Sequence, residues 1–79
     1  MRIEVMYFGM LAEITGQTRE FWETTENLTV AAFRSQVVGK YPMLEHKKFK
    51  IAVNKRIAED TAQIPEQGEL ALLPPFAGG

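Results

Sequence analysis

Cysteine is absent from the 79 residues of this chain. The fold therefore has no disulfide or thiolate-bound metal to stabilise it, and it offers no cysteine nucleophile. This composition is compatible with a reducing compartment. The sequence also passes from Met1 directly into alternating residues, without a charged and then apolar signal segment. We therefore expect a cytoplasmic protein.

An excess of one charge and long apolar runs are also missing. Nine basic and ten acidic side chains give a formal net charge of −1, which argues against the strongly basic surface of a dedicated nucleic-acid-binding protein. No apolar run approaches the roughly 20 residues that are needed to cross a bilayer. We expect neither a nucleic acid nor a membrane among the partners.

The short chain limits what the protein can contain. Residues 1–79, of which 46% are hydrophobic and 24% charged, leave room for one core and for no large self-contained active site. A domain of this size buries only about 60% of the surface that its unfolded chain exposes, so its stability margin is thin. We expect a single domain.

Alternating apolar and polar residues predict a first strand over residues 2–8. Its core-facing side chains would be Ile3, Val5 and Tyr7. One or two helical turns are expected over residues 10–15, and then a second strand over residues 19–24, which would pair with the first through a hairpin-like connection. Phe21 and Trp22 are adjacent in that strand and face opposite sides, so one of them should lie in the core.

The apolar period changes at Val30, where residues three, four or seven positions apart form one stripe on a helix. The stripe consists of Val30, Phe33, Val37, Val38 and Tyr41. Thr29 is the expected N-cap, because its hydroxyl can accept a hydrogen bond from an amide of the first turn. Gly39 near the end and Pro42 just after it predict where the helix stops.

Short strands are expected in the second half of the chain. Residues 49–53 alternate as a third strand, and a turn at Asn54 and Lys55 returns as a short strand over residues 56–58. Residues 70–73 are a nearly unbroken apolar run, which predicts a central strand that is buried on both faces. The order of elements predicts an α+β fold, a β-grasp roll in which a mixed sheet packs against one main helix.

The extended C-terminal tail, residues 74–79, is the most informative segment. Pro74 and Pro75 fix φ and remove amide donors, so they end the sheet pairing and carry the backbone away as an extended segment. Gly78 and Gly79 have no side chains, so the chain can thread a passage too narrow for a Cβ atom. The tail is therefore suited to a partner's active site.

The terminal carboxylate of Gly79 is the expected reacting group. A carboxylate is ionised at neutral pH and is a poor acyl electrophile until something activates it. Adenylation would activate it. Attack by sulfur would then give a thiocarboxylate, whereas attack by a thiol or an amine would give a thioester or an amide. The domain supplies no base, metal or nucleophile for these steps, so we expect a separate ATP-using enzyme and no bound cofactor. The residues expected to contact a partner are Pro74, Pro75, Phe76, Ala77 and Gly78.

The sequence resembles the small, sulfur-carrier subunits of molybdopterin synthase, a ubiquitin-like β-grasp family. The resemblance spans the whole chain, and its most diagnostic element is the double proline that is followed by two residues and a diglycine. The matching stretches are 5–8, 11–13 with Gly16, 28–30, 52–54, 68–69 and 72–79. Glu69 stands alone where the family has an acidic pair, and Leu72 and Leu73 replace Phe-Phe.

The resemblance implies a function in molybdenum cofactor biosynthesis. Gly79 would be adenylated by an activating enzyme, thiocarboxylated with sulfur from a sulfurtransferase, and inserted into the large catalytic subunit of a heterotetrameric molybdopterin synthase. There it would give sulfur to cyclic pyranopterin monophosphate, and two transfers would make the dithiolene of molybdopterin. The chain would be a non-catalytic subunit that acts as a sulfur-donor co-substrate.

Other functions are compatible with the same tail. A sulfur carrier for thiamine or for tRNA thiolation would use the same thiocarboxylate. A ubiquitin-like protein modifier would instead be joined to lysines through an isopeptide bond. A binding module with an inert tail would use neither reaction. Three observations distinguish these functions. Sulfur at Gly79 indicates a carrier, attachment of Gly79 to other proteins indicates a modifier, and tolerance of a terminal extension indicates a binding module.

Two polar features away from the tail are expected to be solvated. His46 is the only histidine, and no converging ligands accompany it, so we expect an exposed side chain rather than a metal ligand. The basic stretch 47–56 is expected to be a solvated strand edge. Lys55 and Arg56 are its candidates for a contact with a protein partner.

Overall fold

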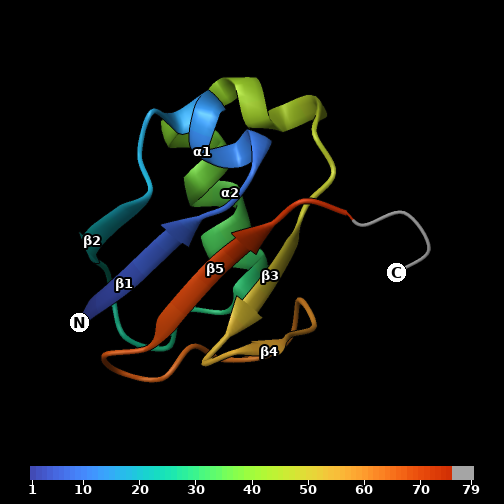
Figure 1. Ribbon diagram of the computed structural model, residues 1–79. Helices are drawn as coiled ribbons and strands as arrows, with labels where there is room; N and C mark the ends of the chain where they lie inside the picture. Colours follow the sequence, from blue (N-terminus) through green and yellow to red (C-terminus); the bar gives the residue numbers. More distant parts are fainter. Residues whose placement is uncertain (76–79) are drawn as a thin grey trace.

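The computed structural model describes residues 1–75, in which five strands form one mixed sheet with the helices on one face (Figure 1). The sheet order is β2-β1-β5-β3-β4, with β1 and β5 parallel and the other neighbouring pairs antiparallel. This arrangement is the predicted α+β architecture, a ubiquitin-like β-grasp. The elements in chain order are β1 (Arg2–Tyr7), α1 (Met10–Thr15), β2 (Arg19–Glu23), α2 (Val30–Lys40), the 3₁₀ helix η1 (Pro42–His46), β3 (Lys50–Val53), β4 (Arg56–Ile57) and β5 (Glu69–Leu73).

The first two strands confirm the predicted alternation. The inward side chains of β1 are buried, and β2 pairs with β1 so that Trp22 lies opposite Ile3. Trp22 is buried whereas its neighbour Phe21 is 56% exposed, as expected for adjacent residues of a strand. The connection between β1 and β2 contains α1 and is therefore longer than a tight hairpin turn.

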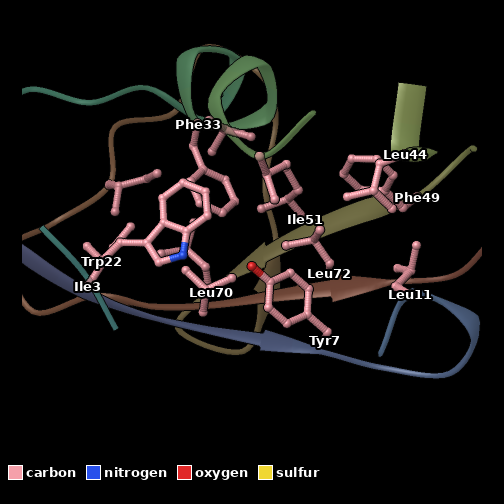
Figure 2. Close-up of a cluster of buried hydrophobic side chains, with 14 of the residues drawn as sticks. Ile3, Tyr7, Leu11, Trp22, Phe33, Leu44, Phe49, Ile51, Leu70 and Leu72 are labelled. Atoms are coloured by element: carbon pink, nitrogen blue, oxygen red, sulfur yellow. The ribbon is translucent and has the colours of Figure 1, made fainter. Parts of the chain in front are cut away.

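The long helix α2 begins where the sequence predicts it. The hydroxyl of Thr29 accepts a hydrogen bond of 3.2 Å from the amide of Ala32, which satisfies one of the free amides of the first turn. Val30, Phe33 and Val37 of its apolar stripe are completely buried. The stripe therefore packs α2 onto the sheet, and Phe33 contacts Trp22 with 5.1 Å between ring centroids (Figure 2).

A third helical segment, η1, is separated from the end of α2 by one residue and was not predicted. Pro42 is its first residue, a position that suits proline because the missing amide would have no helical partner there. Leu44 of η1 is completely buried. Pro42 therefore ends α2, as predicted, and also begins a short turn that adds Leu44 to the core.

The last strand, β5, lies centrally between β1 and β3, as predicted, but it is not buried on both faces. Leu70 and Leu72 point into the core and are completely buried, whereas Ala71 and Leu73 are only partly buried. The helices cover one face of the sheet (Figure 1), and no other element of residues 1–75 covers the opposite face. The apolar run therefore combines a buried row with a half-exposed row.

Candidate functional site

The candidate site is the point where the chain leaves the sheet. β5 (Figure 1) ends at Leu73, and Pro74 and Pro75 follow it in the chain. Leu73 is paired with Lys50 in β3, and it is the last paired residue before the prolines. The prediction that the prolines end the sheet pairing is confirmed. The other predicted site residues, Phe76, Ala77, Gly78 and Gly79, lie outside the described residues.

Pro74 packs against the turn between β1 and α1. A Cβ atom built on Gly9 would lie 3.2 Å from Cγ and 3.9 Å from Cδ of Pro74. Gly9 also has a φ of 58° and a ψ of −134°, a backbone conformation that favours glycine. In the sequence analysis Gly9 falls between the strand expected over residues 2–8 and the helical turns expected over residues 10–15, and it has no other role there. A contact between positions 9 and 74 joins distant parts of the chain and has no signal in local sequence.

The open face of the sheet next to this exit is apolar. Met6 of β1 lies opposite Ala71 of β5, and Ala71 lies opposite Ala52 of β3, so the three side chains form one row across the strands. Phe8, which follows β1, is 44% exposed. Met6 and Ala71 are partly buried and Ala52 is buried, so Phe8 is the most exposed of these apolar side chains.

A polar cluster lies on the core side of β1 and β2. Oε1 of Glu20 accepts hydrogen bonds of 2.7 Å from the hydroxyls of Tyr7 and Tyr41, and one of 3.4 Å from the indole of Trp22. Its Oε2 atom accepts a hydrogen bond of 3.0 Å from the ammonium of Lys40. Residues from β1, β2 and the end of α2 are thus joined through one carboxylate.

The cluster holds its members in fixed protonation states. Burial on its own favours the neutral form of Glu20, but the hydrogen bonds that its carboxylate accepts lower its pKa to about 2. Burial and the neighbouring Glu20 carboxylate raise the pKa of Tyr41 to about 12 and raise the pKa of Tyr7 well above its ordinary value. At neutral pH the ionised Glu20 carboxylate accepts the hydrogen bonds that the protonated phenols of Tyr7 and Tyr41 donate. The arrangement therefore suits a structural anchor rather than proton transfer.

Neither a membrane span nor a metal centre is built from the described part of the chain. None of the helices within residues 1–75 is long and apolar enough to cross a bilayer. Those residues also contain no group of three or more His, Cys, Asp or Glu side chains that could hold a metal ion. His46 is exposed at the end of η1.

Lys55 and Arg56, the predicted candidates for a protein contact, are exposed at the edge of the sheet. Lys55 belongs to the predicted turn, which has positive φ angles of 49° at Asn54 and 72° at Lys55. Arg56 begins β4, the last strand in the sheet order. Neither residue is near Leu73 in the strand register, because Arg56 pairs with Val53, at the opposite end of β3 from Lys50. The structure does not bring these two residues together with the prolines.

Comparison with known proteins gives matches along almost the whole chain. The ThiS family matches residues 5–79. The molybdopterin synthase sulfur carrier subunit of Mycobacterium tuberculosis is 33% identical over 100% of this chain and 99% of that protein. The crystal structure of small archaeal modifier protein 1 of Haloferax volcanii is 25% identical and covers 95% of this chain and 98% of its own, with a TM-score of 0.82.

A third similar structure comes from a protein–protein complex. It is a chain of the complex of subunits 1 and 2 of the molybdopterin-converting factor of Helicobacter pylori. That chain is 22% identical, and the two chains cover each other completely with a TM-score of 0.69. This likeness supports the fold described above.

Proposed function

This chain belongs to the ThiS family, and from that premise we propose that it carries sulfur in molybdenum cofactor biosynthesis. The observation that carries the proposal is the match, over the full length of both proteins, to a relative named as a molybdopterin synthase sulfur carrier subunit. The way the chain leaves the domain is consistent with it. A central strand of the sheet runs directly into Pro74 and Pro75 and so presents the segment that ends in Gly79.

We propose that the carboxylate of Gly79 is the group that carries sulfur. In the first step a carboxylate oxygen attacks the α-phosphate of ATP, and pyrophosphate leaves. The outer sulfur of a persulfide on a sulfurtransferase then attacks the acyl carbon, and AMP leaves. A thiol next attacks the sulfurtransferase sulfur of the resulting acyl disulfide, which releases the thiocarboxylate at Gly79 and leaves a disulfide on the sulfurtransferase. The ATP and the base belong to an activating enzyme. This chain binds no cofactor in the cycle and supplies the acyl group.

The recipient of the sulfur is cyclic pyranopterin monophosphate, held by the large catalytic subunit of molybdopterin synthase. Two transfers build the dithiolene. In each, sulfur bonds to the pterin and water then hydrolyses its bond to the Gly79 acyl carbon, which returns a carboxylate that is charged again. A narrow passage into the active site of the large subunit would account for Gly78 and Gly79, because glycine fits where a Cβ atom does not. Phe76 and Ala77 between the prolines and the glycines would contact the walls of that passage. The reported complex of two molybdopterin-converting factor subunits supports a large-subunit partner.

The experiment combines chemical and functional readouts. The chain is incubated with its activating enzyme, ATP and a sulfur donor, and mass spectrometry is expected to show sulfur in place of one oxygen at Gly79. The charged chain is then given to the large subunit and the pterin precursor. A chain that ends in a carboxamide at Gly79 is the matched control, because it keeps every side chain and loses only the ionisable oxygen. It should fold normally and form no thiocarboxylate.

A variant that lacks Gly78 and Gly79 completes the test. It should have the same melting temperature as the full chain and should make no molybdopterin. Formation of molybdopterin by this shortened chain would refute the proposal. Ser35→Ala, an exposed change on α2, serves as a neutral variant and should transfer sulfur normally.

A protein modifier is the second candidate, because one similar solved structure is named as a small archaeal modifier protein. In that function a lysine amine attacks the activated carbonyl of Gly79, and an isopeptide bond forms as the activating group leaves. Searching proteolysed cell extracts for lysines that carry the C-terminal residues of this chain distinguishes the two. Abundant conjugates without thiocarboxylate would favour the modifier.

A further inference from the structure

The contact between Gly9 and Pro74 has two separable components. The φ of 58° at Gly9 belongs to the region that favours glycine. Independently, the position that a Cβ atom would take is only 3.2 Å from Cγ of Pro74, closer than two carbon atoms pack comfortably. The ring of Pro74 therefore lies against a bare α-carbon.

Hydrogen bonds hold both sides of this contact. The amide of Phe8 donates to the carbonyl of Leu72 at 3.2 Å, which extends the pairing of β1 with β5. The carbonyl of Gly9 accepts from the amide of Ala12 at 3.1 Å, at the first turn of α1. Hydrogen bonds therefore hold the backbone of β5 at Leu72, and they hold the turn between β1 and α1 at Gly9.

Pro74 itself depends on packing. Proline has no amide hydrogen, so Pro74 cannot continue the ladder that ends at Leu73. Its ring is partly buried, whereas Pro75 is exposed. The turn at Gly9 is thus the surface against which the chain rests as it leaves the sheet.

Gly16 shows that the two components can occur separately. It has a φ of 73°, which also favours glycine, but no atom lies within 4 Å of the position that its Cβ would take. At Gly16 the backbone conformation alone accounts for glycine. At Gly9 the close approach of Pro74 is a second reason for glycine, because a Cβ atom would crowd the proline ring.

We propose that Gly9 is a positioning residue for sulfur transfer, because its missing side chain lets Pro74 rest on the β1–α1 turn and so sets the direction in which the tail leaves β5. This inference rests on the proposed function. Gly79 is the fifth residue after Pro74, so at most about 17 Å of chain joins them. A displaced proline ring therefore changes the direction in which the chain leaves β5. A segment whose first residue is held in place also loses less conformational entropy when a partner binds it.

The test is a double-mutant cycle on thiocarboxylated chains that are assayed with the large subunit and the pterin precursor. Gly9→Ala should raise the KM for the carrier roughly ten-fold with a smaller change in kcat, because productive docking weakens and the chemistry does not change. Gly16→Ala, the matched control, should stay within about two-fold of the unmodified chain. In a Pro74→Ala background the effect of Gly9→Ala should shrink, because the ring that it displaces is absent.

Equal KM values for Gly9→Ala and Gly16→Ala would overturn the inference. An undiminished effect of Gly9→Ala in the Pro74→Ala background would do the same, since backbone strain alone would then explain it. Nuclear Overhauser contacts between the α-protons of Gly9 and the ring of Pro74 test the contact without any partner, and their absence from the unmodified chain also counts against it. If the unmodified chain transfers no sulfur, the proposed function fails, while these contacts still decide whether Pro74 rests on Gly9.

Discussion

The hydroxyl of Tyr41 donates a hydrogen bond of 2.7 Å to Oε1 of Glu20, which joins the C-cap of α2 to β2. The same oxygen accepts from Tyr7, so one carboxylate receives the phenols of two tyrosines that themselves pack edge to face, with 5.9 Å between ring centroids. The glutamate side chain is 15% exposed. Hydrogen bonds of this kind compensate for the partial burial of its charge.

We predict that this cluster makes stability depend on pH in the acid range. The folded state lowers the pKa of Glu20 from an ordinary value of 4.5 to about 2. A group with a lowered pKa stabilises the folded state fully above its unfolded value and loses that contribution as the pH falls through its folded value. The free energy of unfolding should therefore decline between about pH 4.5 and pH 2, and less steeply in Glu20→Gln. Urea titrations across this range measure it.

Glu23→Gln is the matched control for that comparison. It removes a carboxylate from the same strand, at an exposed position. The pH dependence of its unfolding should follow that of the unmodified chain. If Glu20→Gln and Glu23→Gln gave the same acid profile, the cluster around Glu20 would not be the source of the dependence.

Removing one donor should destabilise the protein at neutral pH. Tyr41→Phe keeps the ring and deletes the hydrogen bond to the Glu20 carboxylate. Hydrogen bonds to charged groups contribute about 1.5–3 kcal/mol, so we expect a loss within that range in urea unfolding at pH 7. A loss below a few tenths of a kcal/mol would mean that Tyr7 and Lys40 satisfy Glu20 without Tyr41.

Phe33, the aromatic residue of α2, should be highly sensitive to truncation. Its side chain is completely buried and packs on Trp22. Truncation to alanine costs about 3–5 kcal/mol at such sites, which is a large part of the stability of a domain of this size. We expect Phe33→Ala to be largely unfolded or to melt far below the unmodified chain in circular dichroism.

Phe21→Ala is the matched variant, because Phe21 is 56% exposed and its ring makes a cation–π interaction of 4.5 Å with the guanidinium of Arg2. The same chemical change there should cost less than about 1 kcal/mol. Similar melting temperatures for Phe21→Ala and Phe33→Ala would be incompatible with the core described here.

Local patterns predicted β1 and α2 because each of them has one buried apolar face. Alternation at Ile3, Val5 and Tyr7 located β1, and the spacing of Phe33 and Val37 located α2. Thr29 was identified as the N-cap because its role depends on an amide only three residues away. Such signals lie within a few residues of each other in sequence.

Other features depend on the tertiary structure. The central position of β5 was predicted from its apolar run, but Leu73 and Ala71 stay half-exposed because the helices cover one face only. The polar cluster joins Tyr7, Glu20 and Tyr41, which are far apart in sequence. Their shared role becomes visible only when β1, β2 and α2 pack together.

The central place of β5 determines how the domain bears mechanical load. The strand is paired along its length with parallel β1 on one side and antiparallel β3 on the other. Tension along the axis of β5 acts across the hydrogen bonds of both ladders, which are perpendicular to the strands in the antiparallel β3–β5 pair and slanted in the parallel β1–β5 pair. These bonds must then break together in shear rather than one at a time. The two ladders of β5 therefore resist together a force that is applied along this strand.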